Sequence, residues 1–315
     1  MSDLCLVTGG GGFIGSHLVD GLVRAGYAVR VLDDFSTGLR DNLAHHGSRV
    51  EIVEGSLTDP ATAAKGVAGA KFVFHLGALA SVARSVEAPL VSHEACATGT
   101  VVVLDAARKA GVKRVMYAAS SSMYGGYSTP EGQKEDLLPC TLSPYAAAKL
   151  AGEYYMQAFA ATYGIETVRL RFFNIFGPRQ RADSPYSGVI AIFTALMTKG
   201  TAPTVHGDGM QARDFTYVAN AVQAMMKAAT APGVSGNVYN VGTGSSITVL
   251  DLVQALNGVM GKNLTALHGE PRTGDVRYSQ ADISRTRNDL GYDPTVAFKD
   301  GLAKTLKWYR GEAWE

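Results

Sequence analysis

Tyr145 and Lys149 stand four residues apart in the segment SPYAAAK, and this pair has the clearest potential for chemistry. Residues four apart lie on the same side of a helix, so the Lys149 ammonium can stabilise an ionised phenol at Tyr145. That phenol would otherwise have a pKa of about 10. Pro144 suits the first turn of such a helix, which we expect to end at Gly164. The pair predicts a base that takes a proton from an alcohol.

Three serines, Ser120, Ser121 and Ser122, follow residues 114–118, an apolar segment typical of a buried strand. A hydroxyl at the carboxyl end of that strand could relay a proton between a substrate and the phenolate. Taken alone, the serines are equally consistent with loop hydrogen bonds, and the Tyr-Lys pair with an exposed helical pair. Their occurrence together favours acid–base chemistry.

A glycine-rich turn, TGGGGFIG, lies close to the start of the chain. Gly9, Gly12 and Gly15 are spaced by three, and Gly10 supplies the alternative G-x-G-x-x-G spacing. A strand is expected before the turn and a helix over residues 13–25 after it. In that context the turn predicts that a pyrophosphate binds at the helix N-terminus. A tight turn without a ligand is the competing interpretation.

Asp33 stands about twenty residues beyond the glycines, at the tip of the next predicted strand, residues 29–32. A carboxylate at this point suits the hydroxyls of an adenosine ribose and would repel a 2'-phosphate. NAD is therefore favoured over NADP, unless Asp33 and Asp34 are simply a solvated surface pair. With the phenol base, the turn predicts a nicotinamide cofactor beside an alcohol substrate.

The composition excludes several classes of protein. The chain has 315 residues, 18% of them charged, and a net charge of +1, so we expect no nucleic-acid partner. No apolar stretch is long enough to span a bilayer, and the start looks like a strand rather than a cleavable signal. Cys5, Cys96 and Cys140 match neither a metal site nor a disulfide framework. We expect reduced, buried thiols in a cytoplasmic protein without a metal centre.

Apolar segments at 50–54, 72–76, 114–118 and 167–171 alternate with helical ones. This alternation predicts an α/β fold with a Rossmann-type doubly wound parallel sheet over residues 1–176. The alternation weakens beyond, so residues 177–315 are expected to form a smaller α/β substrate lobe, with some segments returning to the first. Helices are expected there at 189–199, 220–229, 249–260 and 282–290.

Eight segments carry a resemblance to a known family: TGGGGFIGSHL, LDDFSTG, FHLGALASVARS, ASSSMYGG, SPYAAAKLAGE, RFFNIFGPRQ, GDGMQARDF and PRTGDVRYSQAD. They extend over nearly the whole chain, which resembles the extended short-chain dehydrogenases/reductases and, within them, the UDP-hexose 4-epimerases. The resemblance implies a bound NAD, a UDP-sugar substrate, and inversion at C4 of the sugar through a transient 4-keto intermediate.

The resemblance also assigns roles. Tyr145 would be the base, Lys149 its partner and a ribose ligand, and Ser120 the relay, with Ser121 as the fallback. Further cofactor contacts would come from the loops that follow the first strands and from one later aromatic residue. These are Gly9, Gly12, Phe13, Ile14, Gly15, Asp33, Asp34, Ser36, Thr37, Gly38, Ser56, Leu57, Leu76, Gly77, Ala78, Ala80 and Phe173.

The implied substrate site contains cations and amides that suit a pyrophosphate. Its members are Arg84, Ser85, Ser120, Ser121, Ser122, Asn174, Arg213, Arg272, Asp275 and Ser279. Ser279 falls where some relatives carry a tyrosine, so the pocket should have room for an N-acetylhexosamine. Arg179 and Arg181 leave a uronic acid substrate open. For the arginines the competing interpretations are ion pairs, such as Arg213 with Asp214, or plain surface charge.

Other activities of the same family remain alternatives: a UDP-glucuronate 4-epimerase, or a nucleotide-sugar dehydratase, decarboxylase or reductase. Dehydratases and decarboxylases carry acidic residues directly after the relay hydroxyl, where this chain has Ser121 and Ser122. A catalytically silent binding module is a further alternative.

The chain departs from the family pattern at three places. Ser56 replaces an aspartate, Cys96 an asparagine, and Ala219-Asn220 an acidic pair. The resemblance further implies a homodimer formed by the helices at 98–110 and 145–163.

Overall fold

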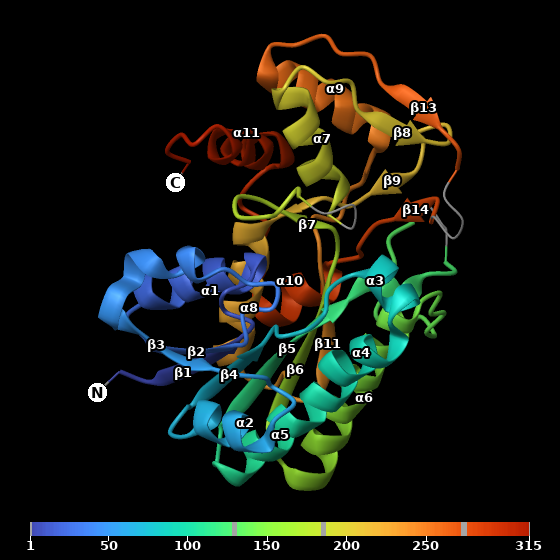
Figure 1. Ribbon diagram of the computed structural model, residues 1–315. Helices are drawn as coiled ribbons and strands as arrows, with labels where there is room; N and C mark the ends of the chain where they lie inside the picture. The colour runs from blue at the N-terminus through green and yellow to red at the C-terminus, as the bar shows by residue number, and fades with distance from the viewer. Residues whose placement is uncertain (1, 128–130, 184–186, 272–275, 315) are drawn as a thin grey trace.

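A seven-stranded parallel sheet forms the lower part of the molecule (Figure 1). The computed structural model describes residues 2–127, 131–183, 187–271 and 276–314. The strand order is β11-β6-β5-β4-β1-β2-β3, which is a Rossmann-type order and confirms the predicted fold class. The strands are β1 (Leu4–Thr8), β2 (Ala28–Asp33), β3 (Val50–Glu54), β4 (Phe72–His75), β5 (Arg114–Ser120), β6 (Glu166–Phe172) and β11 (Asn237–Val241).

Helices cover both faces of the sheet, so its central strands are apolar along almost their whole length. In β1, Cys5 and Val7 pack into a core with α1 (Phe13–Arg24) and α8 (Val218–Thr230). Leu6 points to the opposite face because side chains alternate along a strand. There it packs into a second core with α2 (Pro60–Val67), α5 (Gly99–Lys109) and α6 (Pro144–Tyr163).

A smaller upper part has its own core, built mainly by α7 (Val189–Thr198), α9 (Val249–Met260) and α11 (Phe298–Tyr309). Short strands accompany these helices. They are β7 (Ile175–Phe176), β8 (Thr204–His206), β9 (Ala212–Arg213), β10 (Thr216–Tyr217), β12 (Ile247–Thr248), β13 (Leu267–Gly269) and β14 (Tyr278–Ser279). Strand β11 and helix α8 follow residue 177 in sequence yet belong to the sheet part, so the chain passes between the two parts more than once.

The helix expected at 98–110 begins earlier than its sequence suggests. It starts as α4 (Pro89–His93), passes through a five-residue π-helical turn, Glu94–Thr98, and continues as α5. A π-helical turn inside an α-helix often marks a functional position. Here the turn places Cys96 against α6.

The prediction of buried thiols is correct for Cys5 and Cys96 but wrong for Cys140, which is exposed; all three are free. Cys140 lies in the segment between β5 and α6, at a position without regular secondary structure. None of the helices in the described residues has the length and apolarity that crossing a bilayer requires.

Candidate active site

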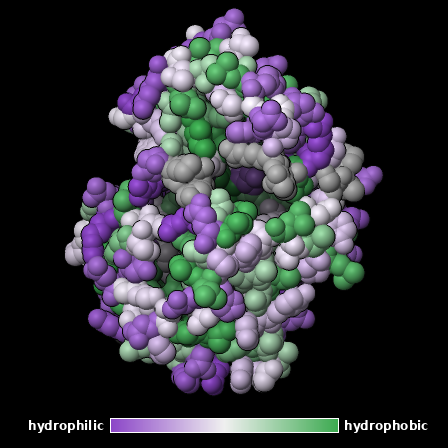
Figure 2. Space-filling view, turned by 45° about the vertical axis from the view of Figure 1, so that its right-hand side comes forward, coloured by the Kyte–Doolittle hydropathy of each residue, from purple (hydrophilic) through white to green (hydrophobic). Residues whose placement is uncertain are grey.

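The predicted chemistry converges on one edge of the sheet, where the parallel strands end. The glycine-rich turn follows β1, Asp33 ends β2, Ser56 follows β3, Leu76 and Gly77 follow β4, and Ser120 ends β5. Ligands of open parallel sheets bind at this edge. Figure 2 shows a hollow on one face of the molecule, between the lower and upper parts.

The glycine turn is shaped by contacts that exclude side chains. Gly9 has a φ of 69°, and a Cβ there would lie 2.8 Å from the Gly77 nitrogen. A Cβ on Gly15 would overlap the Gly9 carbonyl oxygen. Within the described residues no side chain caps α1 at Gly12, and the first turn of α1 has no acidic residue. The N-terminus of α1 is therefore suited to an anionic ligand.

Asp33 is almost buried, with 8% of its surface exposed, and its carboxylate orders the turn. One oxygen accepts the Gly11 N–H at 2.8 Å and the other accepts the Phe35 N–H at 2.8 Å. Burial raises the pKa of Asp33, and these two hydrogen bonds oppose that rise. Each carboxylate oxygen keeps a further acceptor site, so the proposed ribose contact remains possible.

The rest of the LDDFSTG segment packs on the same turn. The Asp34 carboxylate accepts the Ser36 N–H at 2.9 Å and its hydroxyl at 2.6 Å. A Cβ on Gly38 would come 2.8 Å from the Gly11 carbonyl carbon, and Thr37 precedes this close approach. The segment therefore forms one wall of the candidate dinucleotide site.

Tyr145 is the second residue of α6, and two serines fix the start of that helix. Ser143 caps it by accepting the Ala146 N–H at 3.2 Å. The Tyr145 N–H donates to the Ser85 hydroxyl at 3.0 Å. Ser85 is fully buried, so the structure gives it a contact to the backbone of the base. Its neighbour Arg84 is exposed on α3 (Val82–Glu87).

Ser120 is the serine that reaches the phenol of Tyr145. Burial raises the pKa of Tyr145, and a hydrogen bond with the Ser120 side chain lowers it. The Ser120 hydroxyl also lies 2.8 Å from the Ser122 hydroxyl and accepts the Ser122 N–H at 3.2 Å. Ser121 begins the short helix that these bonds cap. The geometry supports Ser120 as the relay.

Lys149 is buried one turn further along α6, with 4% of its surface exposed. Its ammonium donates to the Ala118 carbonyl at 2.9 Å and lies 4.7 Å from the centre of the Tyr117 ring. Burial lowers the pKa of Lys149. In this structure Ser120, rather than Lys149, is the group that lowers the Tyr145 pKa.

The remaining predicted cofactor contacts surround these groups. Leu57 packs closely against Gly77 and Gly99. Phe173 is 1% exposed, and its ring lies 6.0 Å from that of Tyr124, so it supports the serine loop. Phe13, Ile14, Leu76 and Ala78 are partly buried, and Ala80 is exposed.

Two of the predicted substrate residues, Arg213 and Ser279, meet on short strands of the upper part. Arg213 of β9 is the register partner of Ser279 of β14, and its guanidinium donates to the Ala212 carbonyl at 2.8 Å. The Asn174 amide donates to the Asp214 carbonyl at 3.4 Å. Arg213 also lines a hollow of about 260 Å³ with Phe215, Thr243, Ser245, Ile247, Pro294, Val296, Ala297 and Phe298. Arg272 and Asp275 lie outside the described residues.

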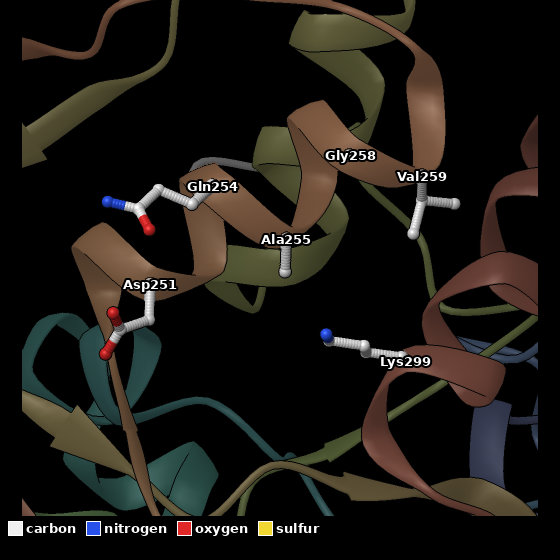
Figure 3. A pocket seen from close by; sticks show the side chains of 6 residues that line it. All are labelled: Asp251, Gln254, Ala255, Gly258, Val259 and Lys299. Atoms are coloured by element: carbon white, nitrogen blue, oxygen red, sulfur yellow. The ribbon is translucent and has the colours of Figure 1, made fainter.

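A larger hollow, of about 370 Å³, lies between α9 and α11 (Figure 3). Asp251, Gln254, Ala255, Gly258 and Val259 line it from α9, and Lys299 reaches toward it from α11. None of the predicted site residues is among its lining residues.

Arg179 belongs to an arrangement that the sequence did not reveal. Its guanidinium lies 2.8 Å from one oxygen of Asp20 on α1. The other oxygen contacts His45 at 2.9 Å and His46 at 2.7 Å. Asp20, His45 and His46 are the side chains in the described part of the chain whose ligand atoms lie close enough together to hold a metal ion. Arg179 and the two imidazoles already engage the carboxylate, so the cluster ties α1 to the loop after β7. No sequence spacing signals a contact between residues so far apart.

Comparison with known proteins adds a second line of evidence. Residues 5–242 match the model of the NAD dependent epimerase/dehydratase family. The chain belongs to this family. A UDP-glucose 4-epimerase of Mycolicibacterium smegmatis is 36% identical over 98% of this chain and 99% of its own. Membership confirms the predicted relationship and the dependence on NAD.

Two solved structures of the family are also similar. A Thermotoga maritima UDP-glucose 4-epimerase with UDP-glucose has a TM-score of 0.93 and 36% identity, covering 98% of this chain and 99% of its own. A Methanobrevibacter ruminantium UDP-N-acetylglucosamine 4-epimerase in complex with UDP-N-acetylmuramic acid has a TM-score of 0.93 and 35% identity, covering 99% of both chains.

The three departures from the family pattern have structural partners. Ser56 bonds the Thr58 hydroxyl at 2.8 Å. Cys96 packs in a small buried cluster with Tyr145 and Ala148. The Asn220 amide both donates to and accepts from the Val296 backbone, at 2.9 and 3.0 Å. Asn220 thus attaches α8 to the segment before α11.

Proposed function

We propose that this chain is a cytoplasmic NAD-dependent UDP-sugar 4-epimerase that acts through a transient 4-keto sugar. The observation that carries the proposal is that Ser120 lies at the end of β5, close enough to lower the pKa of the Tyr145 phenol, at the strand edge that also holds the glycine turn. In this arrangement Tyr145, through Ser120, takes the proton of the C4 hydroxyl. The glycine turn and Asp33 would hold NAD, which would supply the oxidant for the C4 hydride and the means of returning it.

The chain's own residues explain why the base needs help. Burial raises the Tyr145 pKa, so the Ser120 hydrogen bond alone does not ionise the phenol. Lys149 is held one turn away by the Ala118 carbonyl, and its charge together with that of a bound nicotinamide cofactor would favour the phenolate. Gly12 leaves the N-terminus of α1 open for a pyrophosphate, and Asp33 at the end of β2 would bind the ribose.

Two alternatives within the family are less well supported. A dehydratase or decarboxylase would need a carboxylate after the relay, and this chain has Ser121 and Ser122 there. A uronate carboxylate would need a cation, but Arg179 is 10% exposed and paired with Asp20, and Arg181 is paired with Asp183. These pairings favour a sugar without a carboxylate.

We also propose that the sugar pocket accepts N-acetylhexosamines. Ser279 is small, partly buried and directly paired with Arg213, so it leaves space that a tyrosine would fill. Ser279→Tyr should reduce kcat/KM for UDP-N-acetylglucosamine and spare UDP-glucose. An equal loss on both substrates would contradict this assignment.

The test of the proposed function is incubation of the purified protein with UDP-glucose, UDP-N-acetylglucosamine and UDP-glucuronate, without added cofactor, followed by NMR of the products. C4 inversion without other change is expected, and Tyr145→Phe should lower the rate by roughly 10²- to 10⁴-fold. Loss of water or of CO₂ would support the family alternatives. A Tyr145→Phe variant as active as the wild type would refute the role of the base.

The surface of α4 and α6 supports a homodimer. Leu90, Val91, Tyr154 and Tyr155 are all more than two-fifths exposed, and α4 contacts α6 (Figure 1). Such a patch is typical of an interface. Leu90→Glu should give monomers in sedimentation velocity, whereas Leu267→Glu on β13 should not. A monomeric wild type would contradict the dimer.

A further inference from the structure

His75, at the end of β4, lies fully buried in a hydrogen-bonded chain that joins two walls of the candidate site. Its Nδ1 lies 2.7 Å from the Thr8 hydroxyl and its Nε2 lies 3.0 Å from the Thr100 hydroxyl. Thr8 accepts the Gly77 N–H at 3.0 Å. Thr100 donates to the Cys96 carbonyl at 2.6 Å. These hydrogen bonds therefore connect Gly77, in the loop after β4, with Cys96 in the π-helical turn.

In this hydrogen-bonded chain, only one placement of the protons gives every donor an acceptor. Because Thr100 donates its hydroxyl proton to Cys96, it can only accept from His75, so Nε2 carries the imidazole proton. Because Thr8 already accepts from Gly77, its own proton is free for Nδ1. The opposite tautomer would leave the Thr8 hydroxyl without an acceptor. It would also take the donor away from the Cys96 carbonyl.

Both ends of the hydrogen-bonded chain lie next to groups that the proposed function uses. Gly77 belongs to the loop proposed to contact the cofactor, and a Cβ on Gly9 would meet its backbone. Cys96, at the other end, packs in the same small cluster as Tyr145. The His75 ring also stacks on Tyr117 at 5.6 Å, and the Lys149 ammonium lies over that same Tyr117 ring.

Burial and the nearby Lys149 charge together keep the imidazole neutral by lowering the His75 pKa to about 3. A charged imidazole would place a second cation beside Lys149 and would lose the acceptor that Thr8 requires. The protonation of His75, and with it the hydrogen-bonded chain, therefore stays the same across the pH range in which Tyr145 would act as a base.

We propose that His75 is a positioning residue, which through Thr8 and Thr100 fixes the cofactor loop at Gly77 relative to the Cys96 turn that packs against Tyr145. This inference rests on the proposed function. It says that buried hydrogen bonds, which contact neither NAD nor the sugar, set the distance between the cofactor and the Tyr145 base. Small displacements of reacting groups cause large losses of rate.

The first test is independent of any activity. Long-range ¹H–¹⁵N NMR of protein labelled at histidine, with the His75→Phe variant for assignment, reports the tautomer directly. The expected signal is protonated at Nε2 and bare at Nδ1, and unchanged from about pH 5 to about pH 9. A ring that is protonated at Nδ1, or that titrates in this range, would overturn the hydrogen-bonded chain.

The second test compares two valine variants that each lose one buried bond to a carbonyl four residues earlier. Thr100→Val loses the bond to Cys96 and the contact with His75. Thr305→Val loses an equivalent bond to Gly301, 2.7 Å long, in α11. Thr100→Val should lower kcat by roughly 10-fold with little change in KM and with bound NAD retained. Thr305→Val should change neither kcat nor KM.

A third test separates this inference from the proposed function. The Tyr145 phenol is titrated by its absorbance, which is the wild-type signal minus the signal of Tyr145→Phe. If the wild type inverts no UDP-sugar, the proposed function fails, and the phenol titration still tests the positioning. Its midpoint should move in Thr100→Val and stay fixed in Thr305→Val. Positioning is refuted if Thr100→Val leaves kcat and the midpoint unchanged, or if both variants alter them equally.

Discussion

Replacing Gly15 by alanine should break the turn that begins α1. The new Cβ would overlap the Gly9 carbonyl oxygen and lie 2.9 Å from the Gly10 Cα, while real Cβ atoms essentially never approach closer than 3.0 Å. Both neighbours are backbone, so no side-chain rotation relieves the overlap. Forcing atoms into a packed site commonly costs about 1–3 kcal/mol, and we expect a loss of about 3 kcal/mol of unfolding free energy here.

Gly258→Ala is the matched control, since Gly258 also lies within a helix, α9, and a Cβ there would meet nothing within 4 Å. It should stabilise the protein by about 0.5–1 kcal/mol, because alanine loses less entropy than glycine in a helix. Urea unfolding measures both changes, and heat release of bound dinucleotide shows whether Gly15→Ala still holds NAD. A Gly15→Ala protein with wild-type unfolding and full NAD content would refute the argument for the turn.

Two further predictions concern the buried histidines His17 and His75 and the buried carboxylate Asp33. Burial lowers the pKa of His17 to about 4 and that of His75 to about 3. Below pH 6.5 the unfolded chain therefore binds protons that the folded protein does not, and stability should fall as the pH falls from 6.5 toward 4. The loss is about 2 kcal/mol per histidine between pH 7.5 and 5 by urea unfolding. A flat profile would contradict it. Asp33→Asn should lower the ratio of NAD to NADP affinity in calorimetry, because it removes the charge that repels a 2'-phosphate. An unchanged ratio would show that Asp33 does not select the cofactor.

The sheet and its edge could largely be predicted from the sequence, because strands covered on both faces are apolar throughout. β1, β2 and β5 contain such runs; the glycine turn follows β1, and Asp33 and Ser120 end β2 and β5. β11 was not predicted, because Asn237–Val241 is short and is recognisable as a strand only through its pairing with β6. The π-helical turn before α5 also leaves no mark in local periodicity.

The roles of individual side chains were harder to predict than their positions. The spacing of Tyr145 and Lys149 gave the shared helix face but not the contact of the ammonium with Ala118, which comes from the neighbouring strand. Ser85 was expected beside the sugar, and its bond to the Tyr145 backbone could not be predicted from the sequence. His75 gave no signal at all, because its partners Thr8 and Thr100 come from distant segments.

The most direct test of C4 hydride transfer is turnover of UDP-glucose in D₂O by the protein as purified, with no added cofactor and with product analysis by NMR. We expect UDP-galactose that carries no deuterium at C4, because the same hydride leaves and returns. Deuterium at C4 of the product, or a protein that neither contains nor binds NAD, would contradict it.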